Sequence, residues 1–277
     1  MTGSYAVLLL VGVLFATTAM SVLWVVQLRI GDASHVDVGW AIEIALVATL
    51  YAVLSDGDVG HRVLAALLAS IWGWRLGLYL LVNRVLGKEE DGRYQALRAK
   101  WGIRANRNFF LFFQFQAAFV LFFSVPYLLI SLDPAEGLGV LEWTGVGLWA
   151  IGNAGAIAAD RQLASWRADP ANRGKTARSG LWGWSRHPNY FFEWVTWCGV
   201  AVVATAAPWG WIGWIVPAGL LFLLFRLTGI PATEEQALRS RADYAEYQRT
   251  TSVFVPLPPR RQGGGMISSP LGSGDRQ

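Results

Sequence analysis

The chain has 277 residues, of which 54% are hydrophobic and only 15% are charged. An average soluble domain carries roughly 25% charged residues. These proportions exclude a soluble domain, a disordered chain and a collagen-like chain, and they favour an integral membrane protein. A single cysteine, Cys198, excludes an intrachain disulfide, a four-cysteine zinc site and a cysteine-bound iron–sulfur cluster. The three histidines, His35, His61 and His187, lie far apart in sequence, so we expect no metal site.

Seven apolar segments long enough to cross a bilayer follow one another along the chain. The first has no charged residue and lacks the basic start of a cleavable signal peptide. The apolar stretch 190–225 is too long for one helix and breaks at Pro208. The predicted spans are residues 5–28, 38–54, 63–82, 109–132, 139–159, 190–207 and 209–225. We therefore predict an all-α protein, with one membrane domain over 1–260 and a disordered tail, rich in Gly and Ser, at 261–277.

The distribution of basic residues predicts the orientation of these spans. Twenty of the 23 Lys and Arg residues lie in the loops 83–108 and 160–189, in the tail from residue 231, or at Arg29. Basic residues gather on the cytoplasmic side of membranes, so we expect the N-terminus outside and the C-terminus in the cytoplasm. The same distribution explains the net charge of +4 without nucleic acid. We expect a multi-pass protein of the bacterial inner membrane that does not bind nucleic acid.

Ionisable side chains at membrane depth are energetically costly and often mark function. The predicted spans contain or border four that we weighed: Asp37, Glu43, Arg75 and Glu193. Helical spacing puts Asp37 on one face with Trp40, and Arg75 on one face with Trp72 and Tyr79. Asp37 could equally be an interfacial helix cap, and Arg75 could form a structural salt bridge.

A second polar cluster lies in the segment that follows the fifth predicted span. Asn153, Asp160 and Arg167 recur at intervals of seven and share a face if that helix continues beyond the membrane. Further on, Pro188 suits the first turn of the next helix, and the free N–H groups there could bind an anion together with Arg186. The alternative is a juxtamembrane anchor of Arg, Trp and Tyr. The chain has no GxGxxG or GxxxxGK[ST] motif, so any nucleotide must lie between helices and loops.

The segment after the last span predicts one more helix. Thr233 and Gln236 have the spacing of a capping box, which predicts a helix that runs to about Arg249. Tyr244 and Tyr247 would share one face of it.

Several of these residues belong to one composite pattern. Its parts are Trp72-x-x-Arg75-x-x-x-Tyr79, Gly87-x-x-Glu90-Asp91-x-Arg93-Tyr94, Asp160-Arg-Gln, Asp169-Pro-Ala-Asn-Arg-Gly-Lys175, Gly180-Leu-Trp, Ser185-Arg-His-Pro-Asn-Tyr190 with Glu193, and Gly229-Ile-Pro-x-x-Glu-Glu with Tyr244-x-x-Tyr247. The pattern covers about residues 35–258 and resembles the steroid 5α-reductase (3-oxo-5α-steroid 4-dehydrogenase) family, most closely its bacterial members. The Glu-Glu tail and an Arg-His-Pro-x-Tyr-like element also resemble isoprenylcysteine carboxyl methyltransferases.

The resemblance implies a seven-helix reductase that binds NADPH from the cytoplasmic side and a lipophilic enone from the bilayer. The cofactor-binding residues expected from it are Asn153, Asp160, Arg167, Lys175, Arg186, His187, Asn189, Tyr190, Glu235, Tyr244 and Tyr247. Arg167, Lys175 and Arg186 would hold the phosphates, including the 2′-phosphate that distinguishes NADPH from NADH.

The resemblance also suggests substrate-binding and catalytic residues. Trp40, Trp72 and Arg75 are expected to contact the substrate. Asp37 falls near the family's ketone-contacting Glu and would act as a protonated donor to the carbonyl oxygen. Trp72 falls near the family's Tyr and cannot donate a phenolic proton, so Tyr79 is a second catalytic candidate by geometry alone.

The expected function is NADPH-dependent reduction of the carbon–carbon double bond of a 3-oxo-Δ4 steroid or a similar lipophilic enone. The partners would be that substrate and the membrane lipids, and we expect a monomer. The alternative enzyme is an S-adenosylmethionine-dependent membrane methyltransferase of the isoprenylcysteine or phospholipid type. The alternative outside enzymology is a sterol-sensing or scaffold protein.

Overall fold

The computed structural model describes residues 2–227 and 229–259, and most of them are helical. These residues contain no β-strand, and one isolated bridge joins Ser185 to Ser252. The all-α class predicted from the sequence is therefore confirmed. The predicted tail at 261–277 lies outside the described residues.

Ten α-helices are found in the described part of the chain. They are α1 (Thr2–Ile30), α2 (His35–Leu54), α3 (Val59–Leu80), α4 (Gly92–Trp101), α5 (Ala105–Ser131), α6 (Val140–Ala168), α7 (Pro188–Thr205), α8 (Ile215–Phe222), α9 (Ile230–Ser240) and α10 (Tyr244–Thr250). Two of them end in a wider π-helical turn, α3 at Leu81–Val85 and α8 at Leu223–Leu227.

Five helical segments of the described residues are long and apolar enough to cross a membrane. They are Tyr5–Ile30, His35–Leu54, Val59–Val85, Gly92–Ser131 and Gly210–Ser240. This number supports a multi-pass membrane protein. The predicted spans 139–159 and 190–207 are helical, within α6 and α7, but they are not among the five.

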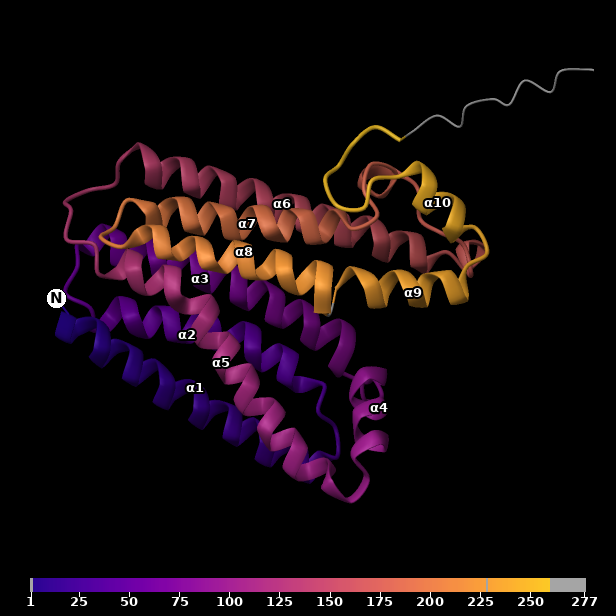
Figure 1. The fold of residues 1–277 in the computed structure, drawn as a ribbon, viewed down its shortest axis with the longest axis horizontal. Helices are drawn as coiled ribbons and strands as arrows, with labels where there is room; N and C mark the ends of the chain where they lie inside the picture. Colours follow the sequence, from indigo (N-terminus) through magenta and orange to yellow (C-terminus); the bar gives the residue numbers. More distant parts are fainter. Residues whose placement is uncertain (1, 228, 260–277) are drawn as a thin grey trace, which may run out of the picture.

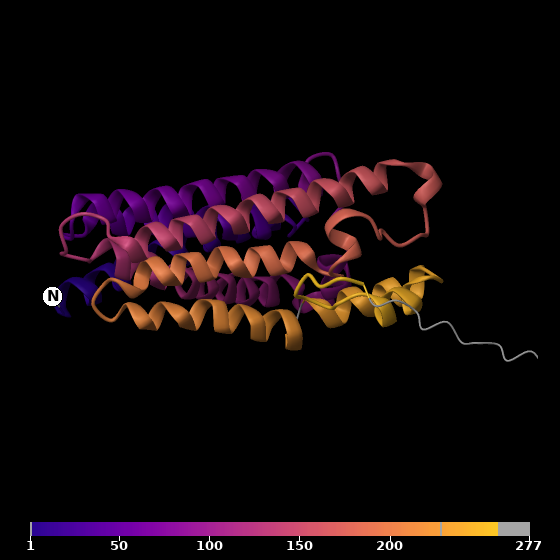
Figure 2. The same cartoon turned by 90° about the horizontal axis from the view of Figure 1, so that it is seen from above.

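The helices form a long bundle in which most of them run along the same axis (Figures 1 and 2). The N-terminus lies at one end, and α4, α9 and α10 lie at the other. α5 crosses the bundle diagonally in Figure 1. α6 and α7 pack closely because glycines face each other: a Cβ at Gly145 would collide with the Gly199 carbonyl, and one at Gly152 with the backbone of Thr196. Small residues allow this kind of backbone approach between apolar helices.

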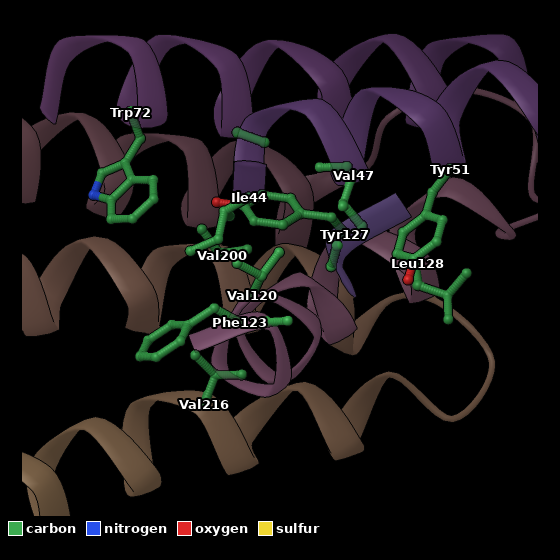
Figure 3. Packing of buried hydrophobic residues seen from close by; sticks show 14 of the residues in the cluster. Ile44, Val47, Tyr51, Trp72, Val120, Phe123, Tyr127, Leu128, Val200 and Val216 are labelled. Atoms are coloured by element: carbon green, nitrogen blue, oxygen red, sulfur yellow. The ribbon is translucent and has the colours of Figure 1, made fainter. Parts of the chain in front are cut away.

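The core joins α2, α3, α5, α7 and α8 through buried aliphatic and aromatic side chains (Figure 3). Trp197 is its centre, because its ring meets Trp72 and Phe123 edge to face, with centroids 4.9 and 4.8 Å away. Trp40 packs edge to face against the same two partners. Such aromatic pairs favour fixed orientations, so this part of the bundle presents a rigid wall.

The C-terminal segment differs from its prediction, because two short helices replace the single one expected to end near Arg249. The chain leaves helical geometry at Arg241, which has extended dihedrals. It is held in the turn by Asp243, whose carboxylate accepts hydrogen bonds from the Thr176 hydroxyl (2.6 Å) and backbone N–H (3.1 Å). The predicted capping box is absent: α9 begins after Gly229, and the Thr233 hydroxyl donates back to the Gly229 carbonyl at 2.8 Å.

Candidate functional site

A cavity of about 500 Å³ lies between α3, α6, α7 and α9, next to the loop that precedes α7. Its inner part, the aromatic end, is lined by Trp40, Trp72, Phe123, Trp197 and Leu220. Its outer part, the basic end, is lined by Arg84, Arg167 and Arg241. On α3, the step from Trp72 to Leu80, both in the lining, spans about 12 Å at 1.5 Å per residue, and Arg84 lies one further turn along the chain.

Most of the residues that the sequence nominated line this one cavity, although they come from segments far apart in the chain. The nominated residues in the lining are Trp40, Trp72, Arg75, Tyr79, Asp160, Arg167, Arg186, His187, Asn189, Tyr190, Tyr244 and Tyr247. Four nominated residues are not in the lining: Asp37, Asn153, Lys175 and Glu235.

Glu193 brings a carboxyl group to the aromatic end. One oxygen accepts a hydrogen bond of 2.5 Å from the Trp72 indole N–H, and the other lies 3.5 Å from Arg75 Nη2. The Nε atom of Arg75 is buried and has no hydrogen-bond partner among the described residues. The aromatic wall therefore contains an acid and an incompletely satisfied base, both aimed at the same space.

Asp160 and Asn189 form a polar pair between the two ends. The Asn189 side-chain N–H donates to Asp160 Oδ1 at 3.2 Å, which links α6 to the first turn of α7. Pro188 occupies the first position of α7, as predicted, where its missing N–H costs no hydrogen bond. In the described part of the chain, the second carboxylate oxygen of Asp160 and the Asn189 side-chain carbonyl have no hydrogen-bond partner, so both can bind a polar ligand such as a sugar hydroxyl or an amide.

The basic end gathers positive charge, and none of its arginines makes a direct contact with an acid among the described residues. No hydrogen bond or ion pair joins the guanidinium of Arg84, Arg167 or Arg241 to any residue in the described part of the chain. Partial burial and the neighbouring charge of Arg241 lower the pKa of Arg167 below its usual value. An adjoining cavity of about 390 Å³ shares Arg167 and Arg241 and adds Arg173 and Lys175. Unpaired cations that repel one another favour a polyanionic ligand.

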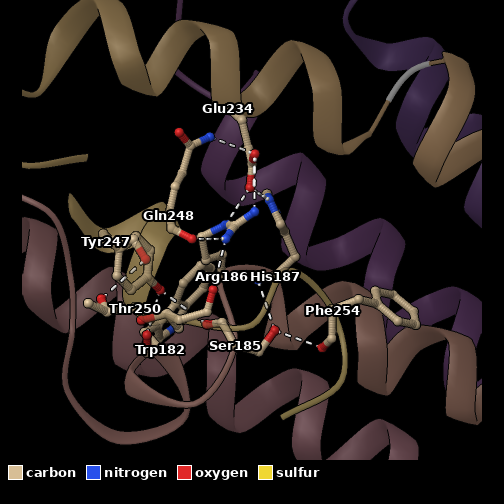
Figure 4. A network of polar contacts seen from close by, with 10 residues as sticks. Trp182, Ser185, Arg186, His187, Glu234, Tyr247, Gln248, Thr250 and Phe254 are labelled. Atoms are coloured by element: carbon tan, nitrogen blue, oxygen red, sulfur yellow. Dashed lines mark hydrogen bonds and ion pairs between the residues drawn. The ribbon is translucent and has the colours of Figure 1, made fainter. Parts of the chain in front are cut away.

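Arg186, predicted to bind phosphate, instead binds groups of the protein itself (Figure 4). Its guanidinium donates to Glu234 Oε1 at 2.6 Å and to the carbonyls of Gln248 and Thr251, each at 2.8 Å. His187 Nε2 lies 3.2 Å from the same carboxylate, and the Gln248 side chain donates to it at 2.8 Å. These contacts leave Arg186 committed to the protein itself, so it closes the cavity wall instead of holding phosphate.

Glu234 therefore joins the loop that precedes α7 to the C-terminal helices. We call its contacts with Arg186, His187 and Gln248 the clamp. Burial opposes ionisation of this carboxyl, but hydrogen bonds from His187, Arg186 and Gln248 outweigh burial and lower its pKa to about 2. Tyr247 strengthens the clamp by donating to the carbonyls of Trp182 and Ser185, at 2.5 and 3.1 Å.

Asp37, nominated as the catalytic acid, lies away from the cavity. Its carboxylate accepts hydrogen bonds from Arg93 at 2.7 Å and from the Tyr94 hydroxyl at 2.6 Å. These two contacts fix α4 against α2 and keep the Asp37 carboxylate turned away from the cavity. The structure thus places Asp37 outside the cavity in which the sequence had expected it to act.

The other three residues outside the lining have contacts of their own. Asn153 is buried within α6 and donates to the Trp149 carbonyl at 3.0 Å. Lys175 lies in the adjoining cavity, next to Arg167. Glu235 is exposed and pairs with Arg239 one helical turn later, and its neighbour Glu234 instead binds Arg186.

Sequence reasoning missed three important members of the site. It singled out Glu193 as an acid at membrane depth but gave it no role, and it overlooked Arg84 and Arg241. The two arginines were not singled out because they lie among many basic residues whose presence the cytoplasmic orientation of the loops already explained. No helical spacing signalled them, because Arg84 lies in the π-helical turn after α3 and Arg241 in the extended turn between α9 and α10.

Residues 23–251 match the family described as "Protein of unknown function (DUF1295)". The match covers most of the chain, including every residue of the cavity lining, so the chain belongs to this family. No curated protein and no solved structure matches the chain.

Proposed function

We propose that this member of the DUF1295 family is an NADPH-dependent reductase of the carbon–carbon double bond of a lipophilic enone, such as a 3-oxo-Δ4 steroid. The observation that carries the proposal is one continuous cavity with an acid on an aromatic wall at one end and unpaired arginines at the other. The resemblance of the composite motif to steroid 5α-reductases supports the same reading.

The basic end fits the phosphates of NADPH. Arg84, Arg167 and Arg241 provide three guanidinium groups without partners among the described residues, and Lys175 is close by in the adjoining cavity. Three or more cations exceed what a ligand with one net charge would neutralise, which disfavours S-adenosylmethionine. Asp160 and Asn189 are suited to ribose hydroxyls or to the nicotinamide amide. Bound there, NADPH supplies the hydride that adds to the β-carbon of the enone.

The aromatic end fits the substrate. Trp40, Trp72 and Phe123 offer flat apolar surfaces to a planar ring system. In this proposal the Glu193 carboxyl is protonated and donates a hydrogen bond to the substrate carbonyl, where negative charge develops during reduction. Trp72 orients that carboxyl through its indole N–H. The α-carbon then takes a proton from water or from the Tyr79 hydroxyl.

We also propose seven membrane spans, with the N-terminus outside and the basic end of the cavity facing the cytoplasm of a bacterial inner membrane. The 18 residues of α7 reach about 27 Å, close to the thickness of a hydrocarbon core. α6 is less apolar than the other spans because its inner face carries glycines that pack against α7 and polar groups that line the cavity. The first turns of α7 carry the cavity residues Asn189 and Glu193.

A binding experiment tests the proposal. NADPH is titrated into the purified protein while energy transfer from tryptophan to the nicotinamide is recorded, and NADH is compared in the same way. NADPH is expected to bind at least tenfold more tightly, a difference of about 1.4 kcal/mol. S-adenosylmethionine competes in a third titration. Equal affinities for both nucleotides, or stronger binding of S-adenosylmethionine, would overturn the proposal and favour the methyltransferase.

A further inference from the structure

A second cluster of ionisable residues lies at the end of the bundle opposite the basic end. His61 is in the first turns of α3, Asp133 follows α5, and Glu142 is in the first turn of α6. From His61 to Tyr79, which lines the cavity, α3 rises about 27 Å. The cluster is therefore remote from the proposed reductase site and plays no part in it.

The imidazole of His61 stands between three carboxylates. Its Nδ1 lies 3.3 Å from Asp58 Oδ1, and its Nε2 lies 3.2 Å from Glu142 Oε1 and 3.6 Å from Asp133 Oδ2. The side chains of His61, Asp133 and Glu142 are only 1%, 2% and 7% exposed. A carboxylate on Nδ1 fixes the neutral ring with its proton on Nδ1, so that the Nε2 lone pair faces the other two acids.

Both facing carboxylates are held in place through their other oxygen. Asp133 Oδ1 accepts from the Ala135 N–H at 3.0 Å, and Glu142 Oε2 accepts from the Gly139 N–H at 2.9 Å. Asp133 Oδ2, however, is buried and has no hydrogen-bond partner in the described part of the chain. Leaving a buried carboxylate oxygen unpaired is costly, so this atom points to a ligand between it and His61.

The charges of the cluster also call for a cation. Three carboxylates surround one imidazole, and the nearest arginine in sequence, Arg62, donates to the carbonyls of Ala52 and Val53 instead. A protonated imidazole would be expected to form charge-assisted hydrogen bonds of about 2.7–2.9 Å, shorter than either contact of Nε2. Two ligands of a tetrahedral zinc ion, each about 2.0–2.1 Å from the metal, lie about 3.3–3.4 Å apart. The separations at Nε2, 3.2 and 3.6 Å, fall on either side of that value.

We propose that His61 Nε2, Asp133 Oδ2 and Glu142 Oε1 bind a divalent transition-metal ion of the zinc type. Asp58 serves as the carboxylate partner of the ligating histidine, which orients the ring and raises its basicity. Three protein ligands leave a fourth position for water. The ion ties the start of α3 to the end of α5 and the start of α6, and so fixes one end of the bundle.

The test uses the full chain without a histidine tag, in detergent, after treatment with EDTA and dialysis. Zn²⁺ at about 100 times its Kd should raise the unfolding temperature by about 5–10 °C. Asp133→Asn and Glu142→Gln should abolish the rise. Glu136→Gln, which alters an exposed acid of the same loop, is the matched control and should keep it. Asp58→Asn should weaken Zn²⁺ binding about 10–100-fold without abolishing it.

A second measurement does not depend on the folding of the variants. Co²⁺ added to the metal-free wild type should develop the visible absorption bands of a four-coordinate ion, and Zn²⁺ should bleach them. The proposal is overturned if wild type gives neither the bands nor the thermal shift, or if Asp133→Asn responds to Zn²⁺ as wild type does.

Discussion

Glu234→Gln is the sharpest test of how the cavity wall is closed, because the change keeps the size of the side chain and removes only its charge. The pKa of Glu234 is lowered from 4.5 to about 2, and each pKa unit corresponds to about 1.36 kcal/mol. Ionisation of Glu234 therefore stabilises the clamp by up to about 3 kcal/mol at neutral pH. Without it, Arg186 is left partly buried with no opposing charge.

The pH dependence follows from the direction of the shift. Because the folded-state pKa lies below the unfolded one, the contribution is complete above about pH 4.5 and is lost as the pH falls towards 2. Near pH 3 it should be about 1.4 kcal/mol, less than half of its neutral value. The difference between Glu234→Gln and wild type in the free energy of opening the clamp should therefore become smaller as the pH falls.

Amide hydrogen exchange provides the assay. The Arg186 N–H donates to the Ser252 carbonyl at 2.8 Å, so its exchange reports on opening of the clamp. Glu234→Gln should accelerate that exchange about 100-fold near pH 7. Glu235→Gln, one residue away and exposed, is the matched control and should change it little. Equal effects of the two substitutions, or a difference that grows in acid, would refute the reasoning.

The other predictions concern binding and turnover at the proposed site. Glu193→Ala should reduce the rate of enone reduction about 10²–10³-fold in a steady-state assay, the loss typical of one deleted oxyanion donor, with NADPH affinity unchanged. Asp37→Asn, outside the cavity, should keep most of the turnover in the same assay. Asn189→Ala should weaken NADPH binding by about 1–3 kcal/mol, measured by calorimetry. Arg241→Ala should weaken NADPH binding about tenfold or more in the tryptophan energy-transfer titration, whereas Arg239→Ala, paired with an exposed acid, should not.

The helical class and the membrane location follow from the sequence because they depend on run lengths of apolar residues. The fifth and sixth predicted spans, now within α6 and α7, are helical but are not among the five segments that are long and apolar enough to cross a membrane. In α6 several apolar positions are glycines that serve backbone contact with α7, and α7 begins with the polar cavity residues Asn189 and Glu193. The gathering of Asp160, Asn189 and Tyr244 in one cavity was also predicted, through the family resemblance.

Side-chain partners that are remote in sequence could not be predicted. Arg93 forms an ion pair with Asp37, 56 residues away in sequence, and only the position of α4 in the fold brings the two side chains together. Glu234 and Glu235 are the same residue type at consecutive positions, and their side chains differ by about 100° in direction around α9. Which of the two faces Arg186 depends on where that helix begins. The cluster of His61, Asp133 and Glu142 draws on three separate segments, so no local spacing signalled it.

The central claim is that hydride passes from NADPH to the β-carbon of an enone held at the aromatic end. The most direct measurement incubates the purified protein in lipid vesicles with a 3-oxo-Δ4 steroid and NADPH that carries deuterium at its transferable position, followed by mass spectrometry of the product. The account predicts a saturated ketone with one deuterium on the former β-carbon, and its loss in Glu193→Ala. Unreduced steroid despite saturable NADPH binding, or a methylated lipid formed from S-adenosylmethionine, would contradict it.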